Sequence, residues 1–419
     1  MIAVKKNTLR YFGKMRAAAL KASRLSGGWL PGILLAVFSV LGIIVRIQKF
    51  DFVSKDAYYF LLEWYDVIRD GGGLKALGTQ VGDYNIMYQT IIALFTYLPI
   101  KPLYAYKILS CIFDVALAVV CARIIYEQTG HCRRLCGALA YGAVLLSPLV
   151  FLNSAMWAQC DSIYTFFCVT ALWLLSNKKD APAFLVFGVA LTFKLQAVFV
   201  LPMMLYTVFC RNKVHLLYVF TVPVVMIVLS LPGIIAGRSV ADIFTIYFNQ
   251  TNSNLVLSNN YPSMLLVVQS YLAKVLWILP KQAYAILKTP LVIFTFLVLA
   301  CYMLYWLKKK VPLTRRNFWV MSFILCFTAV LLLPCMHERY GYVYEILALL
   351  LIFLYPRTLP LMLALYAVTY SAYANYLYFS LSMDMQLSAL FNAYVYIMYI
   401  WYLKGRLVKK KRLPVRPEA

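Results

Sequence analysis

The sequence predicts an all-α membrane protein with about twelve transmembrane helices. Hydrophobic residues make up 63% of the 419 residues, which excludes a soluble fold. Apolar runs of roughly 15 to 22 residues recur to the end of the chain, close to the length that crosses a bilayer. The net charge of +25 does not indicate a nucleic-acid partner, because lysine and arginine collect at the ends of these runs, as expected for cytoplasmic loops.

The chain begins with a basic segment, residues 1–27, which is followed by the apolar run Trp29–Ile47. This run is too long for a signal peptide and lacks its small-residue cleavage site. We therefore expect it to remain as the first span, with residues 1–27 in the cytoplasm.

Residues 48–102 form a long loop after the first span, and we expect catalysis there. A connector needs only a few polar residues, whereas this loop also carries the glycines 71–73 and six of the fifteen acids, Asp51, Asp56, Glu63, Asp66, Asp70 and Asp83. Its apolar run 86–100 could be a second span, but the basic loop 127–135 would then lie outside. We interpret 86–100 as an interfacial or re-entrant helix, which keeps that basic loop in the cytoplasm.

The remaining spans complete a single membrane domain, 1–419, in the plasma membrane. A second large outer loop, 236–284, contains the apolar run 263–279, which must be interfacial for the spans to alternate. Basic clusters place both termini in the cytoplasm, including the tail 404–419. The predicted spans lie near residues 103–126, 137–152, 162–176, a short hairpin at 183–209, 214–235, 285–306, 318–334, 343–356, 359–377 and 386–403.

This topology gathers polar residues on the outer face. An ionisable group at membrane depth costs roughly 2.5 to 3.5 kcal/mol on insertion scales, so several on one side indicate a functional cavity. Lys194 stands among apolar residues with no acid in its hairpin, which leaves an anionic ligand or a distant carboxylate as its partner. The second outer loop adds an amide-rich stretch that suits hydroxyl recognition or is simply solvated: Tyr247, Asn249, Gln250, Asn252, Asn254, Asn259 and Asn260.

Five short motifs occur in order: residues 54–60 (SKDAYYF), 82–85 (GDYN), 153–164 (NSAMWAQCDSIY), 193–196 (FKLQ) and 336–340 (MHERY). In this order the chain resembles the polytopic glycosyltransferases of the GT-C fold, in particular bacterial relatives of dolichyl-phosphate-mannose-dependent mannosyltransferases. Members of that family commonly have a glycine where this chain has Ala158, and often prolines at Ile86 and Met87.

The resemblance implies inverting transfer of a sugar from a polyprenyl-phosphate carrier, such as undecaprenyl phosphate, to an extracytoplasmic glycan, lipid or protein acceptor. It makes Asp56 the catalytic base, since a hydroxyl acceptor must lose its proton. Lys194, His337 and Arg339 would face the leaving phosphate. We expect no metal and no other cofactor, because the outer loops lack an Asp-x-Asp pair and the leaving group is a single phosphate. The other expected substrate-binding residues are Asp83, Tyr84, Asn85, Trp157, Gln159, Asp161, Gln196, Tyr247, Gln250 and Glu338.

Structural roles compete with these assignments. Asp83 could be a turn or helix-capping residue that orders the loop, and Asp161 could be an N-cap. Trp157 could be an anchor of the interfacial aromatic belt. His337 could be a core histidine. The glycines 71–73 favour a turn between two short helices over a phosphate cradle, since no strand precedes them.

Two other function classes remain as alternatives. A transporter or flippase of lipid-linked saccharides would be expected to show internal repeats with interrupted helices, which the sequence lacks. A polysaccharide ligase or polymerase also works outside on lipid-linked sugars, but we expect it to use a pyrophosphate-linked donor and a large late loop. A non-catalytic accessory protein is a further possibility.

Overall fold

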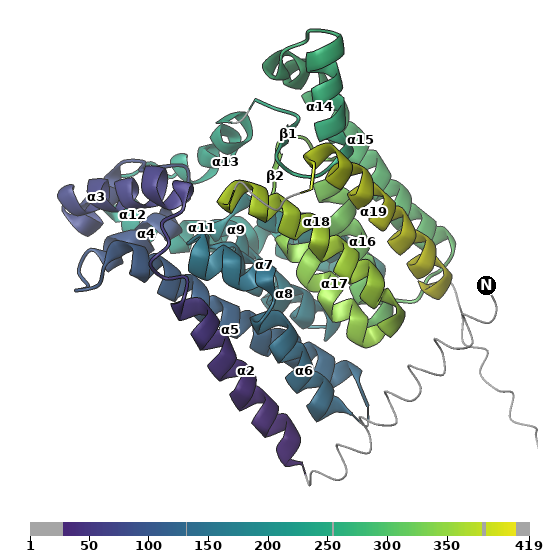
Figure 1. Cartoon of the computed structure of the whole chain (residues 1–419). Helices are drawn as coiled ribbons and strands as arrows, with labels where there is room; N and C mark the ends of the chain where they lie inside the picture. Colours follow the sequence, from purple (N-terminus) through teal and green to yellow (C-terminus); the bar gives the residue numbers. More distant parts are fainter. Residues whose placement is uncertain (1–27, 131, 254, 379–382, 408–419) are drawn as a thin grey trace, which may run out of the picture.

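The computed structural model describes residues 28–130, 132–253, 255–378 and 383–407, and about 80% of the structure is helical. Figure 1 shows the helices as a bundle. The predicted all-α class is confirmed. The basic segment 1–27 and the tail beyond residue 407 lie outside the described residues.

Four of the described helices are long and apolar enough to cross a membrane: α2 (Trp29–Ile47), α5 (Pro102–Gln128), α15 (Pro280–Lys308) and α16 (Arg315–Leu332). A fifth span results if a pair bent by 43° is counted as one, namely α6 (Arg133–Leu145) with α7 (Pro148–Phe151) and the π-helical turn η3 (Leu152–Met156). The bend falls at Pro148, whose ring cannot continue a helix from the preceding turn. The predicted total of twelve spans stays a prediction.

Other predicted spans coincide with helices. They are α8 (Asp161–Ser176), α9 (Asp180–Phe193), α10 (Leu201–Arg211), α17 (Tyr342–Leu354), α18 (Leu359–Leu377) and α19 (Met385–Leu407). The predicted span 214–235 is not one continuous α-helix. It consists of a 3-10 segment η5 (Lys213–Phe220), α11 (Thr221–Leu229) and α12 (Leu231–Ile235), and Pro232 lies in the first turn of α12, where a helix restarts. Between α12 and the next helix comes Arg238, which is buried.

The first loop folds into short helical segments: the π-helical turn η1 (Ala57–Leu61), α3 (Leu62–Asp70), the 3-10 turn η2 (Gly73–Gly78) and α4 (Ile86–Phe95). The glycines form the turn between α3 and η2, with φ of 89° at Gly72 and 65° at Gly73, so the turn interpretation is confirmed. With ten residues, α4 is roughly 15 Å long, half the thickness of a bilayer core, which supports the interfacial interpretation of 86–100.

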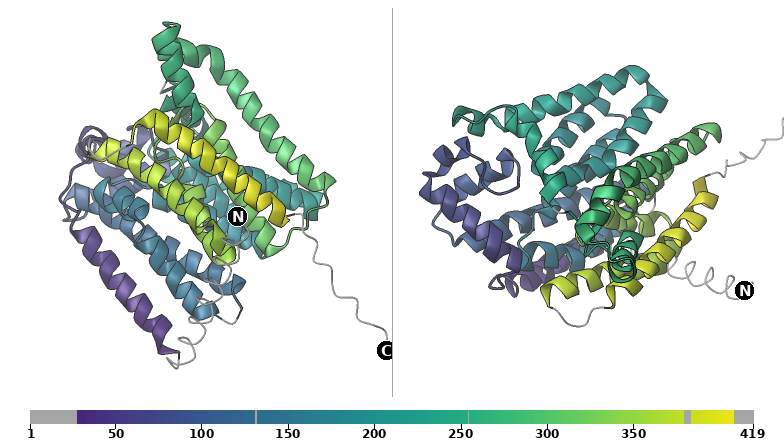
Figure 2. Two further views of the ribbon diagram at one scale, coloured as in Figure 1. Left: turned by 45° about the vertical axis from the view of Figure 1, so that its right-hand side comes forward. Right: turned by 90° about the horizontal axis from the view of Figure 1, so that it is seen from above.

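The second loop contains α13 (Asp242–Ser253), the strand β1 (Ser258–Asn259) and α14 (Met264–Val275). β1 pairs in parallel with β2 (Met336–His337), with Ser258 opposite Met336 and Asn259 opposite His337. The sequence did not predict this pairing, which ties the second loop to the motif 336–340. In Figure 2 α14 and the start of α15 project beyond the other helices.

A buried ion pair joins the first two long helices. Arg46 on α2 lies 2.8 Å from the carboxylate of Asp114 on α5, and the two side chains are 6% and 0% exposed. Ser154 of η3 donates a hydrogen bond of 2.5 Å to the same carboxylate oxygen. Because a buried charge is costly without its partner, these contacts hold η3 against both helices. The next residue after η3 is Trp157.

The two ends of α5 provide a test of the predicted sidedness. Thr79 lies exposed in the first loop, whereas Gly130 follows the far end of α5, a helix roughly 40 Å long. In a background without the native cysteines, Thr79→Cys should react with an impermeant maleimide in intact cells. Gly130→Cys should react only after the membrane is permeabilised. Labelling of both from outside would make 86–100 a span and overturn the topology.

Candidate active site

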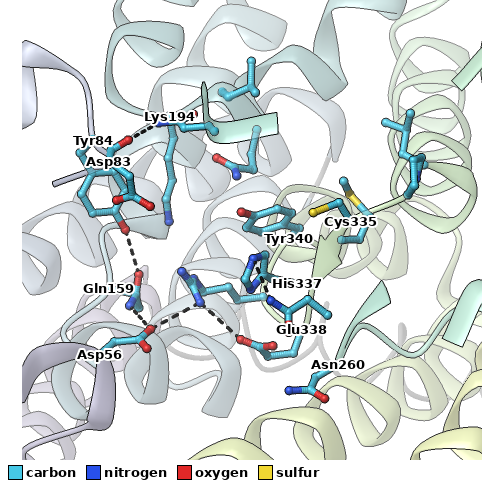
Figure 3. A pocket seen from close by; sticks show the side chains of 18 of the residues that line it. Asp56, Asp83, Tyr84, Gln159, Lys194, Asn260, Cys335, His337, Glu338 and Tyr340 are labelled. Carbon is cyan, nitrogen blue, oxygen red and sulfur yellow. Dashed lines mark hydrogen bonds and ion pairs between the residues drawn. The ribbon is translucent and has the colours of Figure 1, made fainter. Parts of the chain in front are cut away.

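A cavity of about 580 Å³ opens between the first loop, the 3-10 segment η4 (Leu195–Val200), α15 and the residues after α16. Figure 3 shows the side chains that point into it. Four of the predicted residues do not line it: Asn85, Trp157, Asp161 and Tyr247. The other ten predicted site residues do, namely Asp56, Asp83, Tyr84, Gln159, Lys194, Gln196, Gln250, His337, Glu338 and Arg339.

Asp56 lies at the start of the helical turn η1. The turn is positioned by Ser54, whose hydroxyl accepts from the Ala57 backbone N–H (3.1 Å) and donates to the Trp157 carbonyl (2.9 Å). The Asp56 Oδ2 atom accepts hydrogen bonds from Trp157 Nε1 at 2.9 Å and Gln159 Nε2 at 2.8 Å. Tyr376 on α18 donates to Oδ1. These donors fix the orientation of a carboxylate that is only 15% exposed.

Trp157 supports Asp56 from behind the cavity wall. It is fully buried, and its ring stacks on Tyr376 with 4.6 Å between ring centroids, so the interpretation as an interfacial anchor is wrong. The next residue, Ala158, has φ of 65°, a left-handed conformation that glycine adopts without strain.

Lys194 has a distant carboxylate as its partner. Its backbone is extended where α9 ends, and its Nζ atom lies 2.5 Å from Asp161 Oδ1. Asn153 donates to the other oxygen of Asp161 at 2.8 Å. Asp161 makes no side-chain capping bond to α8, so the capping interpretation is wrong. It serves instead as the fully buried counter-ion of Lys194.

Arg339 connects three carboxylates. Its guanidinium lies 3.5 Å from Asp56, 3.6 Å from Asp161 and 3.3 Å from Glu338. Its Cζ atom also lies 5.4 Å from the Trp157 ring centroid, a cation–π contact. One cation therefore holds the first loop, the start of α8 and the segment after α16 together.

Burial shifts the ionisation of two neighbours of Arg339. It raises the pKa of Glu338, which is 2% exposed, from 4.5 to about 7. Burial, together with the positive charges of Arg339 and Lys194, lowers the pKa of His337 to about 3. His337 is therefore neutral near pH 7, and one of its ring nitrogens lies 3.3 Å from the Asn259 amide. It can offer a hydrogen bond but no charge.

Two glutamines hold the segment that carries Asp83 and Tyr84. Gln80 Nε2 donates to the carbonyls of Gly82 (2.8 Å) and Tyr84 (2.9 Å), and Gln89 Nε2 donates to those of Val81 (2.7 Å) and Tyr84 (2.8 Å). The amide oxygens of both accept from Nη1 of Arg238, at 3.0 and 3.2 Å. The Tyr84 hydroxyl then donates to Gln159, which binds Asp56 (Figure 3).

The cap of α4 is Asn85 rather than Asp83, so the capping interpretation of Asp83 is wrong. The Asn85 side chain accepts from the Ile86 backbone N–H at 2.6 Å and donates to the Tyr247 hydroxyl at 2.6 Å. Tyr247 in turn donates to the Leu191 carbonyl on α9. Asp83 is exposed and lines the cavity, and its carbonyl accepts from Gln250.

Several further residues line the cavity. Tyr376 has no signal, because it lies in a predicted span that is rich in tyrosines. Asn259 and Asn260 of the amide-rich stretch line the cavity, whereas the side chains of Asn252 and Asn254 lie outside the described residues. Lys288 on α15 had a clear signal, a charge inside an apolar run, and it lines the cavity with Tyr284. Within the described ranges no group of three His, Cys, Asp or Glu side chains is arranged to hold a metal.

A comparison with protein-family models matches residues 84–334 to glycosyltransferase family 87. The match covers more than half of the chain, so the chain belongs to this family and is a glycosyltransferase of the GT-C type. No curated protein matches the chain significantly. Because the matched range excludes Asp56 and the motif 336–340, the roles of these residues stay proposals.

The raised pKa of Glu338 predicts a pH dependence of stability. Between about pH 4.5 and 7 the folded protein holds a proton that the unfolded chain releases, so stability should fall as the pH rises through this window. The loss is at most about 3.5 kcal/mol, at ~1.4 kcal/mol per pKa unit between 4.5 and about 7. Glu338→Gln removes this titration, and its unfolding temperature in detergent should fall less than that of the wild type between about pH 5 and pH 8.

His337 titrates in both proteins and cancels from the comparison. Asp66→Asn, an exposed change in α3, is the control and should follow the wild type. An equal fall in the wild type and in Glu338→Gln would show that Glu338 does not titrate in this range.

Replacing Arg238 tests whether Gln80 and Gln89 must be held in place to position the segment that carries Asp83 and Tyr84. Arg238→Met leaves the amide oxygens of Gln80 and Gln89 without their donor, which should cost about 1–3 kcal/mol of stability and lower turnover. Arg238→Lys keeps a cationic donor and should restore part of both. The control is Arg69→Met, which changes a half-exposed arginine of α3. If Arg238→Met kept the wild-type unfolding temperature and turnover, the hydrogen bonds from Arg238 to the two glutamines would not be needed for stability or activity.

Proposed function

We propose that this glycosyltransferase is an inverting enzyme that transfers a sugar from a polyprenyl-phosphate carrier to an extracytoplasmic acceptor. The observation that carries the proposal is the oriented Asp56 carboxylate in the wall of a cavity that also contains Arg339. The family match supports sugar transfer, and the resemblance of the five motifs supports the lipid-linked donor.

Asp56 is suited to act as the base. Each carboxylate oxygen has two lone-pair sites. Trp157 and Gln159 occupy Oδ2, whereas Tyr376 occupies one site of Oδ1. We therefore assign the second site of Oδ1 to the acceptor hydroxyl. Asp56 takes the hydroxyl proton while the acceptor oxygen bonds to the anomeric carbon, and the carbon–phosphate oxygen bond breaks on the opposite face of the sugar.

The leaving phosphate gains negative charge, so it needs fixed donors. Arg339 offers a planar, permanently charged fork. His337, being neutral, would donate a hydrogen bond. Lys194 lines the cavity, but Asp161 largely balances its charge. Its share in phosphate binding is therefore smaller than the sequence alone suggested.

The replacement Asp56→Asn tests the base. The amide keeps the shape of the side chain but cannot take a proton, so transfer should fall by at least about a hundredfold. Donor affinity should change only a few fold. The reaction would be followed with purified protein, a polyprenyl-phosphate sugar and a panel of glycan acceptors.

Asp70→Asn, an exposed acid in the same loop, is the matched control and should keep full activity. Near wild-type turnover in Asp56→Asn would assign the base to another residue. No transfer by the wild type from any polyprenyl-phosphate sugar would instead contradict the proposed donor.

A further inference from the structure

The acids around Arg339 outnumber the cations that balance them. Three carboxyl groups lie 3.3 to 3.6 Å from Arg339, and they are between 0% and 15% exposed. They belong to Asp56, Asp161 and Glu338. Lys194 adds a second positive charge, at Asp161. Full ionisation would leave a negative charge without a counter-ion. Because like charges this close oppose one another's ionisation, we expect one of the acids to hold a proton.

Glu338 is the acid with the fewest hydrogen-bond donors. Asp56 and Asp161 each accept at least two bonds besides their contact with Arg339. Among the described residues, Arg339 is the only side chain that binds the Glu338 carboxyl, and this contact is 3.3 Å long. A charge-assisted bond is usually shorter, roughly 2.7–2.9 Å. The raised pKa of Glu338 agrees with this geometry. Glu338 is therefore the acid that holds the proton.

The ionisable groups that face Glu338 do little to favour its charged form. The positive charge of Arg339 favours ionisation, whereas the negative charges of Asp56 and Asp161 oppose it. His337 is neutral near pH 7 and adds no charge. The facing groups are Arg339 and His337 on the same segment, Asp56 in the first loop, Asp161 on α8 and Tyr376 on α18.

Asp56 and Glu338 contact the same nitrogen of Arg339. Nη1 lies 3.5 Å from Asp56 and 3.3 Å from Glu338, and Figure 3 shows the two acids on either side of it. Both acids line the cavity. A negative charge can therefore move from one acid to the other while Arg339 keeps an ionised partner.

Sugar transfer changes the charges at these positions. Asp56 becomes neutral when it takes the acceptor proton. The donor phosphate changes from a singly charged diester to a doubly charged monoester, which is costly to hold in a low-dielectric cavity. The second pKa of a phosphate monoester is about 6. The pKa of Glu338, about 7, is close to this value, so a proton can pass between the two groups with little net cost.

We propose that Glu338 is the general acid of the reaction and protonates the leaving phosphate. As the bond from the anomeric carbon to the phosphate oxygen breaks, its electron pair stays on that oxygen, and the proton of Glu338 passes to the phosphate. Asp56 gains one proton and Glu338 loses one. Both acids return to their starting states by exchange with water after the products leave. This inference rests on the proposed function and adds a second acid–base residue to it.

The pH dependence of transfer by the full-length protein tests the general acid. The wild-type kcat should fall as the pH rises above about 7, because Glu338 loses its proton. Glu338→Gln has no proton to give, so its kcat near pH 6.5 should be lower by about tenfold to a hundredfold and should not fall on the alkaline side. The KM for the donor should change only a few fold. Glu63→Gln, an exposed change in α3, is the control and should keep the wild-type profile.

A second donor separates proton transfer from a structural role of Glu338. In a difluoromethylene phosphonate analogue, a CF2 group replaces the ester oxygen that joins the phosphate to the lipid. The fluorines make the leaving group less basic, so that it departs without a proton. Wild type and Glu338→Gln should use this analogue at similar rates, and the alkaline fall of the wild type should weaken. Glu338→Asp, which keeps an acid, should restore part of the rate with the natural donor.

An equal loss of rate with both donors in Glu338→Gln would overturn the inference, because it would show a structural role. So would an alkaline fall that persists in this variant. If Glu338→Gln does not fold, the wild type decides, since an alkaline fall that is the same for both donors would also overturn the inference. Each of these results leaves the proposed function intact. A wild-type protein that transfers no sugar from any polyprenyl phosphate would overturn the proposed function and this inference with it.

Discussion

The arrangement of the site depends on the need to balance charges that are buried in an apolar bundle. Arg339 lies within 3.6 Å of Asp56, Asp161 and Glu338, and Lys194 is paired with Asp161. Breaking a buried pair leaves an uncompensated charge and typically costs 3–5 kcal/mol. This cost holds the first loop, the start of α8, the end of α9 and the segment after α16 in one place, although they are far apart in the sequence.

Local backbone features refine this arrangement. Both π-helical turns adjoin site residues, with η1 directly after Asp56 and η3 directly before Trp157, and π-turns often occur at functional sites. Ala158, Asn260 and Cys335 have positive φ although none is a glycine. Such strained residues persist only where their surroundings hold them. Here the buried pairs and the β1–β2 contact supply that support.

The sequence predicted which segments meet at the site, but it did not predict which side chains there pair with one another. Ordered motifs and the cost of buried charge pointed to Asp56, Lys194 and Arg339, and all three line the cavity. The partner of Lys194 depends on packing between two helices, which no local pattern encodes. The pairing of β1 with β2 involves two residues on each side, too few for a periodic signal. Lys288 could have been found by the rule that singled out Lys194.

The most direct test is a cryo-EM structure of the protein with a polyprenyl-phosphate sugar bound to the inactive Asp56→Asn variant. We expect density for the sugar beside residue 56 and for the phosphate beside Arg339 and His337. A phosphate beside residue 56 with the sugar away from it would contradict these assignments. So would a donor bound outside the cavity.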